Sequence, residues 1–172
     1  ENATLVFQGS TALNPTSLGG TISSDGTISV IASDVFTGTN GIDISAAAIN
    51  AVGGDLSFDA DGTADINVTG PLNVTAGDFT STVDTGRATY DDLTSSGEQS
   101  WTGETSVDGD VSGTSISATG VTSITGDVSS TGKQTYSGTS TSITGNILDG
   151  AALVFNTPAT INGSIGETET NP

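Results

Sequence analysis

Three carboxylates on one short segment have the residue types and the spacing that could bind a metal ion. Residues 59–65 read Asp-Ala-Asp-Gly-Thr-Ala-Asp, which places Asp59, Asp61 and Asp65 around one glycine. Calcium prefers several carboxylate and carbonyl oxygens on a bent loop, so these three residues are a candidate Ca²⁺ site. The segment lacks the closing glutamate of an EF-hand loop and the nonapeptide period of calcium-binding β-rolls. The alternative is an acidic turn held by hydrogen bonds from side chains to the backbone.

Two aromatic residues suggest a second kind of chemistry, the stacking of a ring on a sugar. Trp101 and Tyr136 occupy matching positions in two similar segments, 97–103 (GEQSWTG) and 132–138 (GKQTYSG). If exposed, the pair would form a flat platform for a carbohydrate. Aromatic residues of strands also fill the core or stack along a ladder, and we favour this packing role. Runs such as 139–142 (TSTS) could form hydroxyl ladders like those of ice-binding solenoids, although outward Thr is also an ordinary strand residue.

The chain has few residues suited to catalysis. It contains no His and no Cys, and Lys133 and Arg87 are its two basic residues. Polysaccharide lyases need a basic residue that takes a proton, and hydrolases need a pair of carboxylates in a cleft. Acidic pairs such as Asp91-Asp92 fit turns equally well. We therefore expect a protein that is not an enzyme and requires no cofactor, with Ca²⁺ as the candidate ion.

The charge of the chain excludes two classes of partner. Twenty acidic residues against two basic ones give a net charge of −18. Nucleic-acid binding needs clustered Lys and Arg, and an anionic membrane would repel this chain. No apolar run approaches the roughly 20 residues of a membrane-spanning helix, so we expect no membrane insertion. The absence of Cys and Met makes the chain indifferent to oxidants, which favours a location outside the cell.

Short strands and turns must position these residues. Apolar and polar residues alternate over three to five positions and then meet Gly, Asp or Asn, as in residues 41–44, 55–58 and 65–68. The one helix candidate, residues 45–52, carries three consecutive alanines but no charged residues at helical spacing. We therefore interpret it as a strand with small side chains.

The C-terminal half contains an internal repeat. A five-residue unit with a central glycine begins at residues 107, 124, 143 and 161, so its copies are 17, 19 and 18 residues apart. This period is shorter than helical repeats of about 33–47 residues and suits one coil of a parallel β-helix. Equivalent apolar residues should then stack in two inward ladders. The first ladder is Val107, Ile124, Ile143 and Ile161, and the second is Val111, Val128, Ile147 and Ile165.

These observations predict an all-β fold, a single-stranded parallel β-helix or β-solenoid with coils of about 18 residues. We expect residues 1–172 to form one solenoid domain, with the clearest repeats in 97–165, and a right-handed coil because parallel crossovers are right-handed. An antiparallel β-sandwich is the alternative, but it does not require a fixed period.

The repeats resemble those of filamentous-haemagglutinin-like bacterial surface proteins. The resemblance is carried by residues 132–138 (GKQTYSG), 143–147 (ITGNI), 152–155 (ALVF) and 161–163 (ING), and it covers roughly residues 97–165. It implies a right-handed parallel β-helix, bacterial secretion, and adhesive or structural work, and it implies no catalytic residues. Those proteins are usually many times longer, so we expect a fragment of an adhesin or a small subunit.

The two ends of a solenoid leave backbone groups unpaired unless something covers them. The N-terminal segment 1–10 contains a strand-like apolar run, Leu5, Val6 and Phe7, and the C-terminal segment 166–172 is polar. We expect both segments to contact neighbouring copies, because a head-to-tail contact that does not close builds a filament. The leading functional hypothesis is a subunit of an extracellular filament or adhesin rod. The alternative is a module that binds glycans or a cell surface.

Overall fold

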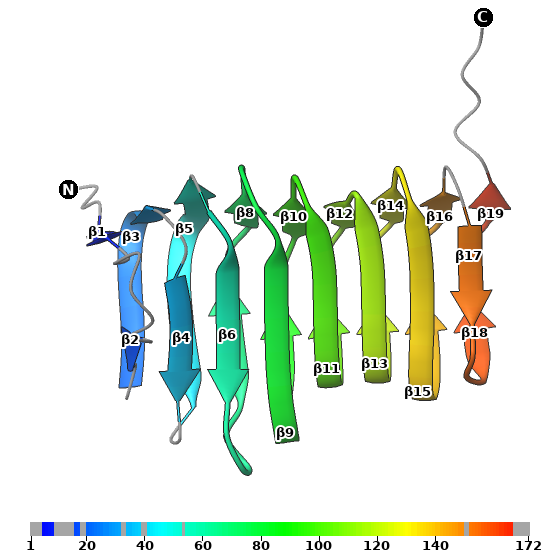
Figure 1. Ribbon diagram of the computed structural model, residues 1–172, viewed down its shortest axis with the longest axis horizontal. Helices are drawn as coiled ribbons and strands as arrows, with labels where there is room; N and C mark the ends of the chain where they lie inside the picture. Colours follow the sequence, from blue (N-terminus) through cyan, green and yellow to red (C-terminus); the bar gives the residue numbers. More distant parts are fainter. Residues whose placement is uncertain are drawn as a thin grey trace, which may run out of the picture.

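Every regular element that the computed structural model describes is a β-strand. The structure describes residues 5–8, 16–17, 20–31, 34–38, 41–52, 54–149 and 152–166, and side chains within 41–52, 54–148 and 152–166. The strands pair in parallel throughout and form one continuous sheet. The sheet winds in stacked coils of about 19 residues, which confirms the predicted β-solenoid and its coil length. Figure 1 shows the coils following one another along the long axis from the N-terminus to the C-terminus.

Each coil contributes to three ladders of strands, which we call faces 1, 2 and 3. Several strands bend from face 1 to face 2, or from face 2 to face 3, so that their two halves belong to different faces. Face 1 consists of β2 (Thr16–Ser17), β4 (Asp34–Gly38), β6 (Leu56–Ala60), the first halves of β9 (Phe79–Tyr90), β11 (Glu98–Val107), β13 (Ser115–Ile124) and β15 (Lys133–Ile143), and β17 (Ala152–Phe155).

Faces 2 and 3 complete the coil. Face 2 consists of the first halves of β3 (Gly20–Ile31) and β5 (Ile42–Val52), β7 (Ile66–Thr69), the second halves of β9, β11, β13 and β15, and β18 (Ala159–Ile161). Face 3 consists of β1 (Leu5–Gln8), the second halves of β3 and β5, β8 (Leu72–Val74), β10 (Leu93–Ser95), β12 (Val111–Gly113), β14 (Val128–Ser130), β16 (Ile147–Asp149) and β19 (Ile165–Gly166). The alanine-rich segment 45–52 lies in β5 and is a strand, as predicted.

The bend between faces 1 and 2 depends on a column of glycines. Gly103, Gly120 and Gly138 have φ of 97°, 128° and 132°, a conformation that residues with a Cβ rarely adopt. The strand pairing is irregular beside the first two of them, between Thr102 and Glu104 and between Thr119 and Val121. One long strand can therefore turn the corner without a separate loop.

The corner between faces 2 and 3 is held by a ladder of side chains bonded to backbone. The Oδ1 atom of Asp92 accepts a hydrogen bond from the backbone N–H of Asp110 at 2.9 Å, and that of Asp110 accepts one from Asp127 at 2.8 Å. Asp127 and Asn146 continue the ladder with bonds of 2.7 and 3.0 Å to the N–H groups of Asn146 and Ser164. Each carboxylate or amide thus satisfies a donor of the next coil, which explains why Asp and Asn follow the central glycine of the repeat unit.

The interior is filled by columns of apolar residues in register. One column on face 3 runs through every coil of that face, from the first strand described to the last. Its members are Leu5, Ile28, Ile49, Leu72, Leu93, Val111, Val128, Ile147 and Ile165. Those from Ile49 to Ile147 are at most 1% exposed, so this column forms a dry axis for most of the rod.

Coil length differs between the two halves of the chain. Residues paired in register are 17 apart at Asp110 and Asp127 but 24 apart at Asp43 and Asn67. The extra residues lie in corner segments such as 61–65, between β6 and β7. This variation explains why the repeat is clear after residue 97 and loose before it.

Candidate functional site

The two predicted ladders lie where their spacing places them. Val107 pairs in register with Ile124, Ile124 with Ile143, and Ile143 with Ile161. The second ladder pairs in the same way through Val111, Val128, Ile147 and Ile165. The first three members of each ladder are at most 1% exposed, whereas Ile161 is partly buried and Ile165 is 58% exposed. The side chains of both ladders are therefore no longer fully buried in the last described coil.

The C-terminal coil is open on one side. β17 and β18 pair with β15, and β19 pairs with β16, so the other edges of these three strands have no strand partner among the described residues. Its inward residues Leu153, Phe155 and Ile161 are packed against the core but only partly buried. The ring of Phe155 stacks on that of Tyr136, with centroids 5.1 Å apart and an interplanar angle of 16°. Within the described residues, this coil therefore combines strand edges that have no strand partner with partly exposed apolar side chains, and such edges can pair with another strand.

The N-terminal end begins with the predicted assembly strand. Leu5, Val6 and Phe7 lie in β1, which pairs in parallel with residues 28–31 of β3. The other edge of β1 has no strand partner in the part of the chain that the structure describes. The side chains of Leu5, Val6 and Phe7, and residues 167–172 of the predicted C-terminal contact segment, lie outside the described set.

Trp101 and Tyr136 belong to the core. They lie in one inward column on face 1 but are separated by Ala118, which pairs with both. They are therefore two coils apart and do not form a directly stacked pair. Both are at most 1% exposed, so neither ring is available to a sugar from solvent. Both rings lie where the packing role places them, in the core. A glycan site has to be sought elsewhere.

The three carboxylates of the calcium candidate do not converge. Oδ1 of Asp65 accepts a hydrogen bond from the backbone N–H of Arg87 at 2.8 Å, in the manner of the corner ladder. The pKa of Asp59 is raised, first by partial burial and then by repulsion from Asp61 and Asp84. Among the described residues no group of three or more acidic side chains is arranged to hold a metal ion. Calcium binding at Asp59, Asp61 and Asp65 stays a prediction that this geometry does not support.

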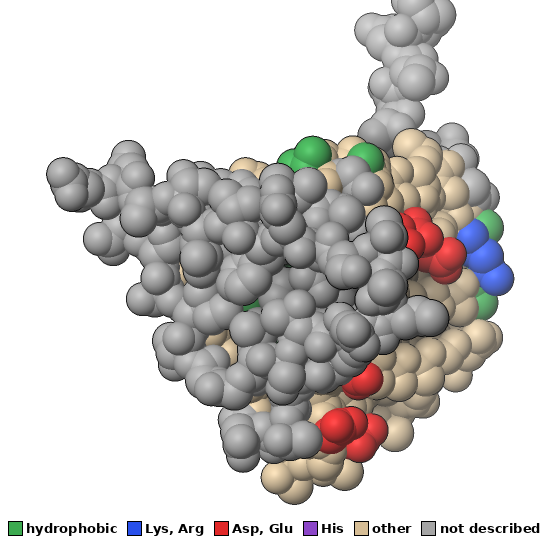
Figure 2. All heavy atoms as spheres, turned by 60° about the vertical axis from the view of Figure 1, so that its left-hand side comes forward, with side chains coloured by type: hydrophobic (Ala, Val, Ile, Leu, Met, Phe, Trp, Pro, Cys, Tyr) green, Lys and Arg blue, Asp and Glu red, His purple; other side chains and the backbone are tan. Residues whose placement is uncertain are grey.

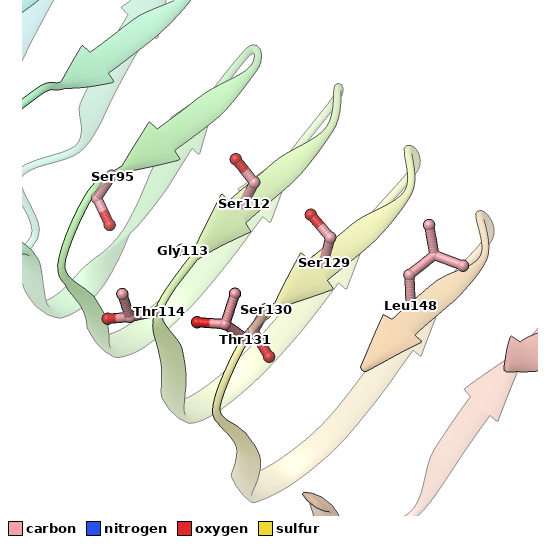
Figure 3. A pocket seen from close by; sticks show the side chains of 8 residues that line it. All are labelled: Ser95, Ser112, Gly113, Thr114, Ser129, Ser130, Thr131 and Leu148. Carbon is pink, nitrogen blue, oxygen red and sulfur yellow. The ribbon is translucent and has the colours of Figure 1, made fainter. Parts of the chain in front are cut away.

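A shallow groove on face 3 has no counterpart in the sequence predictions. It consists of two adjoining hollows of about 450 and 370 Å³ that share Ser112, Ser129 and Leu148. We call this continuous hollow the face 3 groove. The first hollow is lined by Pro71, Asn73, Asp92, Thr94, Asp110, Val111, Ser112, Asp127, Ser129 and Leu148, and the second by Ser95, Ser112, Gly113, Thr114, Ser129, Ser130, Thr131 and Leu148. Figure 3 shows Ser112, Ser129 and Leu148 in a row on successive strands.

The exposed charges are distributed in patches. Arg87 on β9 pairs with Glu104 on β11, and the Arg87 Nε atom lies 2.6 Å from Glu104 Oε1. Figure 2 shows acidic side chains in separate patches on the visible described surface, one of them beside basic side chains. One basic residue is therefore neutralised locally, and none of the acidic side chains that the structure describes is buried.

Comparison with protein-family models, with curated proteins and with solved structures found no match to this chain. Within the described residues there is no helix with the length and apolar character needed to cross a membrane. The fold therefore defines a class, the parallel β-solenoid repeat proteins, and the function has to be argued from its surfaces.

Proposed function

We propose that this chain is a structural subunit of an extracellular bacterial filament or adhesin rod that assembles head to tail. A parallel β-solenoid is compatible with structural or adhesive repeat proteins. The resemblance of residues 97–165 to filamentous-haemagglutinin-like repeats and the absence of Cys and Met support the bacterial, extracellular part of the proposal.

The observation that carries the proposal is the unbroken column on face 3. It begins at Leu5 in β1 and ends at Ile165 in β19, which is 58% exposed because no described strand follows it. A second copy in the same orientation would place its β1 on β19, so that its Leu5 follows Ile165 as the next member of the column. The contact would satisfy backbone groups on both strands and remove apolar surface from water.

Strand direction favours head-to-tail assembly over a symmetric dimer. Every strand pair described is parallel. Two C-terminal coils that met face to face would have to pair by a two-fold axis and could not continue the parallel ladder. Head-to-tail contact keeps the ladder parallel, and because the translation does not close, it generates a filament.

The charge of the chain determines the conditions for assembly. A subunit with a net charge of −18 repels its neighbours, and salt shortens the range of that repulsion. We therefore expect assembly to strengthen as salt rises or when Ca²⁺ is added. Weakening of assembly with increasing salt would contradict this account.

Electron microscopy of the purified chain is the direct test. The proposal expects unbranched filaments one solenoid wide, with an axial repeat equal to the length of one subunit. Dispersed single particles at high protein concentration, in high salt and in Ca²⁺, would overturn it.

A further inference from the structure

The geometry points to the face 3 groove as a binding site for a neutral glycan chain lying along the rod. This inference goes beyond the proposed assembly and does not rest on it, because the groove lies on the lateral surface and not at the ends. It also relocates the glycan candidate, since the rings of Trp101 and Tyr136 are buried.

The lining of the groove includes a column of three hydroxyl groups followed by one leucine. Thr94 pairs in register with Ser112, Ser112 with Ser129, and Ser129 with Leu148. Neighbouring strands are about 4.8 Å apart, so hydroxyls recur at that interval along the rod axis. The Ser112 hydroxyl lies 3.3 Å from the Thr94 Oγ1 atom, to which it donates a hydrogen bond. Such a row can donate hydrogen bonds to a polymer of repeating hydroxyls and accept bonds from it.

One wall of the groove is made of fixed carboxylates. Asp92, Asp110 and Asp127 line the hollow, and the Oδ1 atom of each accepts a hydrogen bond from a backbone N–H of the next coil. This bond holds each carboxylate in one orientation and leaves Oδ2 able to accept hydrogen bonds from a ligand. Ionised carboxylates form strong hydrogen bonds with hydroxyl donors and repel anionic ligands. The wall therefore selects a neutral glycan over an acidic one.

One end of the groove is lined by Gly113 and by a nearly buried serine. Gly113 carries no side chain, and a Cβ atom built on it would lie 3.2 Å from the Ser95 hydroxyl and 3.3 Å from Gln99 Cγ. Ser95 lines the hollow although only 5% of its surface is exposed. Its hydroxyl donates to the carbonyl of Gly97 at 2.9 Å, so its oxygen can still accept a bond. Ser95 therefore adds one polar group with a fixed orientation to the lining, and a few such groups orient a ligand in its site.

The dependence of binding on salt concentration distinguishes a neutral glycan from a ligand that is held by charge attraction. The same carboxylates would attract a polycation, but that attraction weakens as salt screens it. Hydrogen bonds to a neutral glycan depend little on ionic strength. Neutral polysaccharides and poly-lysine therefore distinguish the two cases.

The test is affinity electrophoresis of the full chain in gels that contain dextran, mannan or xylan. We expect retardation by at least one of these neutral polysaccharides, unchanged between low and high salt, and none by polygalacturonate. The double variant Ser112→Ala/Ser129→Ala should weaken the retarding interaction about tenfold, because each lost hydrogen bond contributes roughly a factor of two to ten. Asp110→Asn/Asp127→Asn should also weaken it. It should leave the fold intact, since Asn146 occupies the same column.

The matched control is Ser106→Ala/Ser123→Ala. These two serines pair in register on face 2 of β11 and β13, so the variant removes the same hydroxyls from another face. It should bind like the unmodified chain, and equal loss in both double variants would overturn the groove as the site. Absence of retardation by all three neutral polysaccharides, or binding to poly-lysine alone that fades with salt, would overturn the proposal. Neither result bears on filament formation, which electron microscopy measures separately.

Discussion

Gly145 lies against Gly126 of the preceding coil so closely that a Cβ atom on Gly145 would be 2.1 Å from the Gly126 carbonyl oxygen. The same relationship holds between Gly163 and Gly145, where the distance would be 2.0 Å. Neither Gly126 nor Gly145 has a positive φ, so close approach of two backbones, not conformational freedom, is the reason for glycine here. The central glycine of the repeat unit is thus required by the stacking of the coils.

This relationship predicts that Gly145→Ala destabilises the solenoid. The new methyl group must displace backbone of the adjacent coil, and overpacking of this kind costs about 1–3 kcal/mol or more. Gly166→Ala is the matched control, because a Cβ atom at Gly166 would meet nothing within 4 Å. Urea unfolding followed by circular dichroism measures both. Equal midpoints for the two variants would show that the coils do not approach as closely as described.

The size of side chains alternates in the middle of the inward column of face 1, from Ser81 to Tyr136. Trp101 lies between Ser81 and Ala118, and Ala118 lies between Trp101 and Tyr136. The small residues Ser81 and Ala118 beside the Trp101 ring leave room for it within a coil spacing of about 4.8 Å. We expect Ala118→Leu to lower the free energy of unfolding by about 1–3 kcal/mol. The control is Ser123→Leu, which adds a leucine at an exposed position of the same strand and should change stability by less than about 0.5 kcal/mol.

A buried tyrosine gives the fold a specific response to high pH. The Tyr90 hydroxyl donates to Ser81 Oγ at 2.7 Å, and the ring packs against Phe79 and Phe58. Burial raises the pKa of Tyr90 far above its ordinary value of 10.0, and the hydrogen bond with Ser81 opposes this only in part. The folded chain therefore holds the neutral phenol at a pH where the unfolded chain ionises it.

The sign of this effect follows from the raised pKa. The contribution of the neutral phenol to the free energy of unfolding is fully present below about pH 10. It decreases as the pH rises further, by up to about 1.4 kcal/mol per pH unit. We expect Tyr90→Phe to lose about 1 kcal/mol at pH 7, because Ser81 is left without its partner, and to be less sensitive than the unmodified chain between pH 9 and 11. Unfolding free energies at pH 7, 9 and 11 measure both. Parallel pH profiles for the two proteins would show that Tyr90 ionises freely in the folded state.

The sequence was most informative where one coil copies the next. Val107, Ile124, Ile143 and Ile161 could be assigned to one column because the repeat unit around them has nearly constant length. The similar segments 97–103 and 132–138, which place Trp101 and Tyr136 at matching positions 35 residues apart, have a physical cause that could not be read from the sequence. This separation spans two coils, because the coil between them carries Ala118 where its neighbours carry a ring.

Other features could not be predicted because they depend on corners and outward positions. The coils before residue 97 contain corner segments of different length, so equivalent residues such as Asp43 and Asn67 are 24 positions apart. The face 3 groove depends on how Asp110, just before β12, and Ser112, within β12, project on either side of the buried Val111, and an outward Ser in a strand gives no signal of a hollow. For the same reason the segment 59–65 suggested converging carboxylates, whereas Asp65 bonds to the next coil.

The C-terminal end of the rod can be tested by a single substitution in β19. Ile165→Glu places a charge in the column where the next copy should add its Leu5, and an unpaired charge buried in an apolar contact is strongly unfavourable. Ile165 is 58% exposed in the single chain, so the substitution should leave the stability of the monomer nearly unchanged. We expect filaments to be lost, or their critical concentration to rise at least tenfold, as measured by light scattering and electron microscopy.

Val121→Glu is the matched control for that experiment. Val121 is also an exposed β-branched residue, 36% exposed, but it lies on β13 in the lateral surface of the rod. Both variants add one negative charge, so their difference removes the general effect of a more acidic chain. If Val121→Glu assembles normally and Ile165→Glu does not, the axial contact includes the last member of the column. If both assemble equally well, the contact between copies does not pass through β19, and the head-to-tail arrangement proposed for Leu5 and Ile165 is wrong.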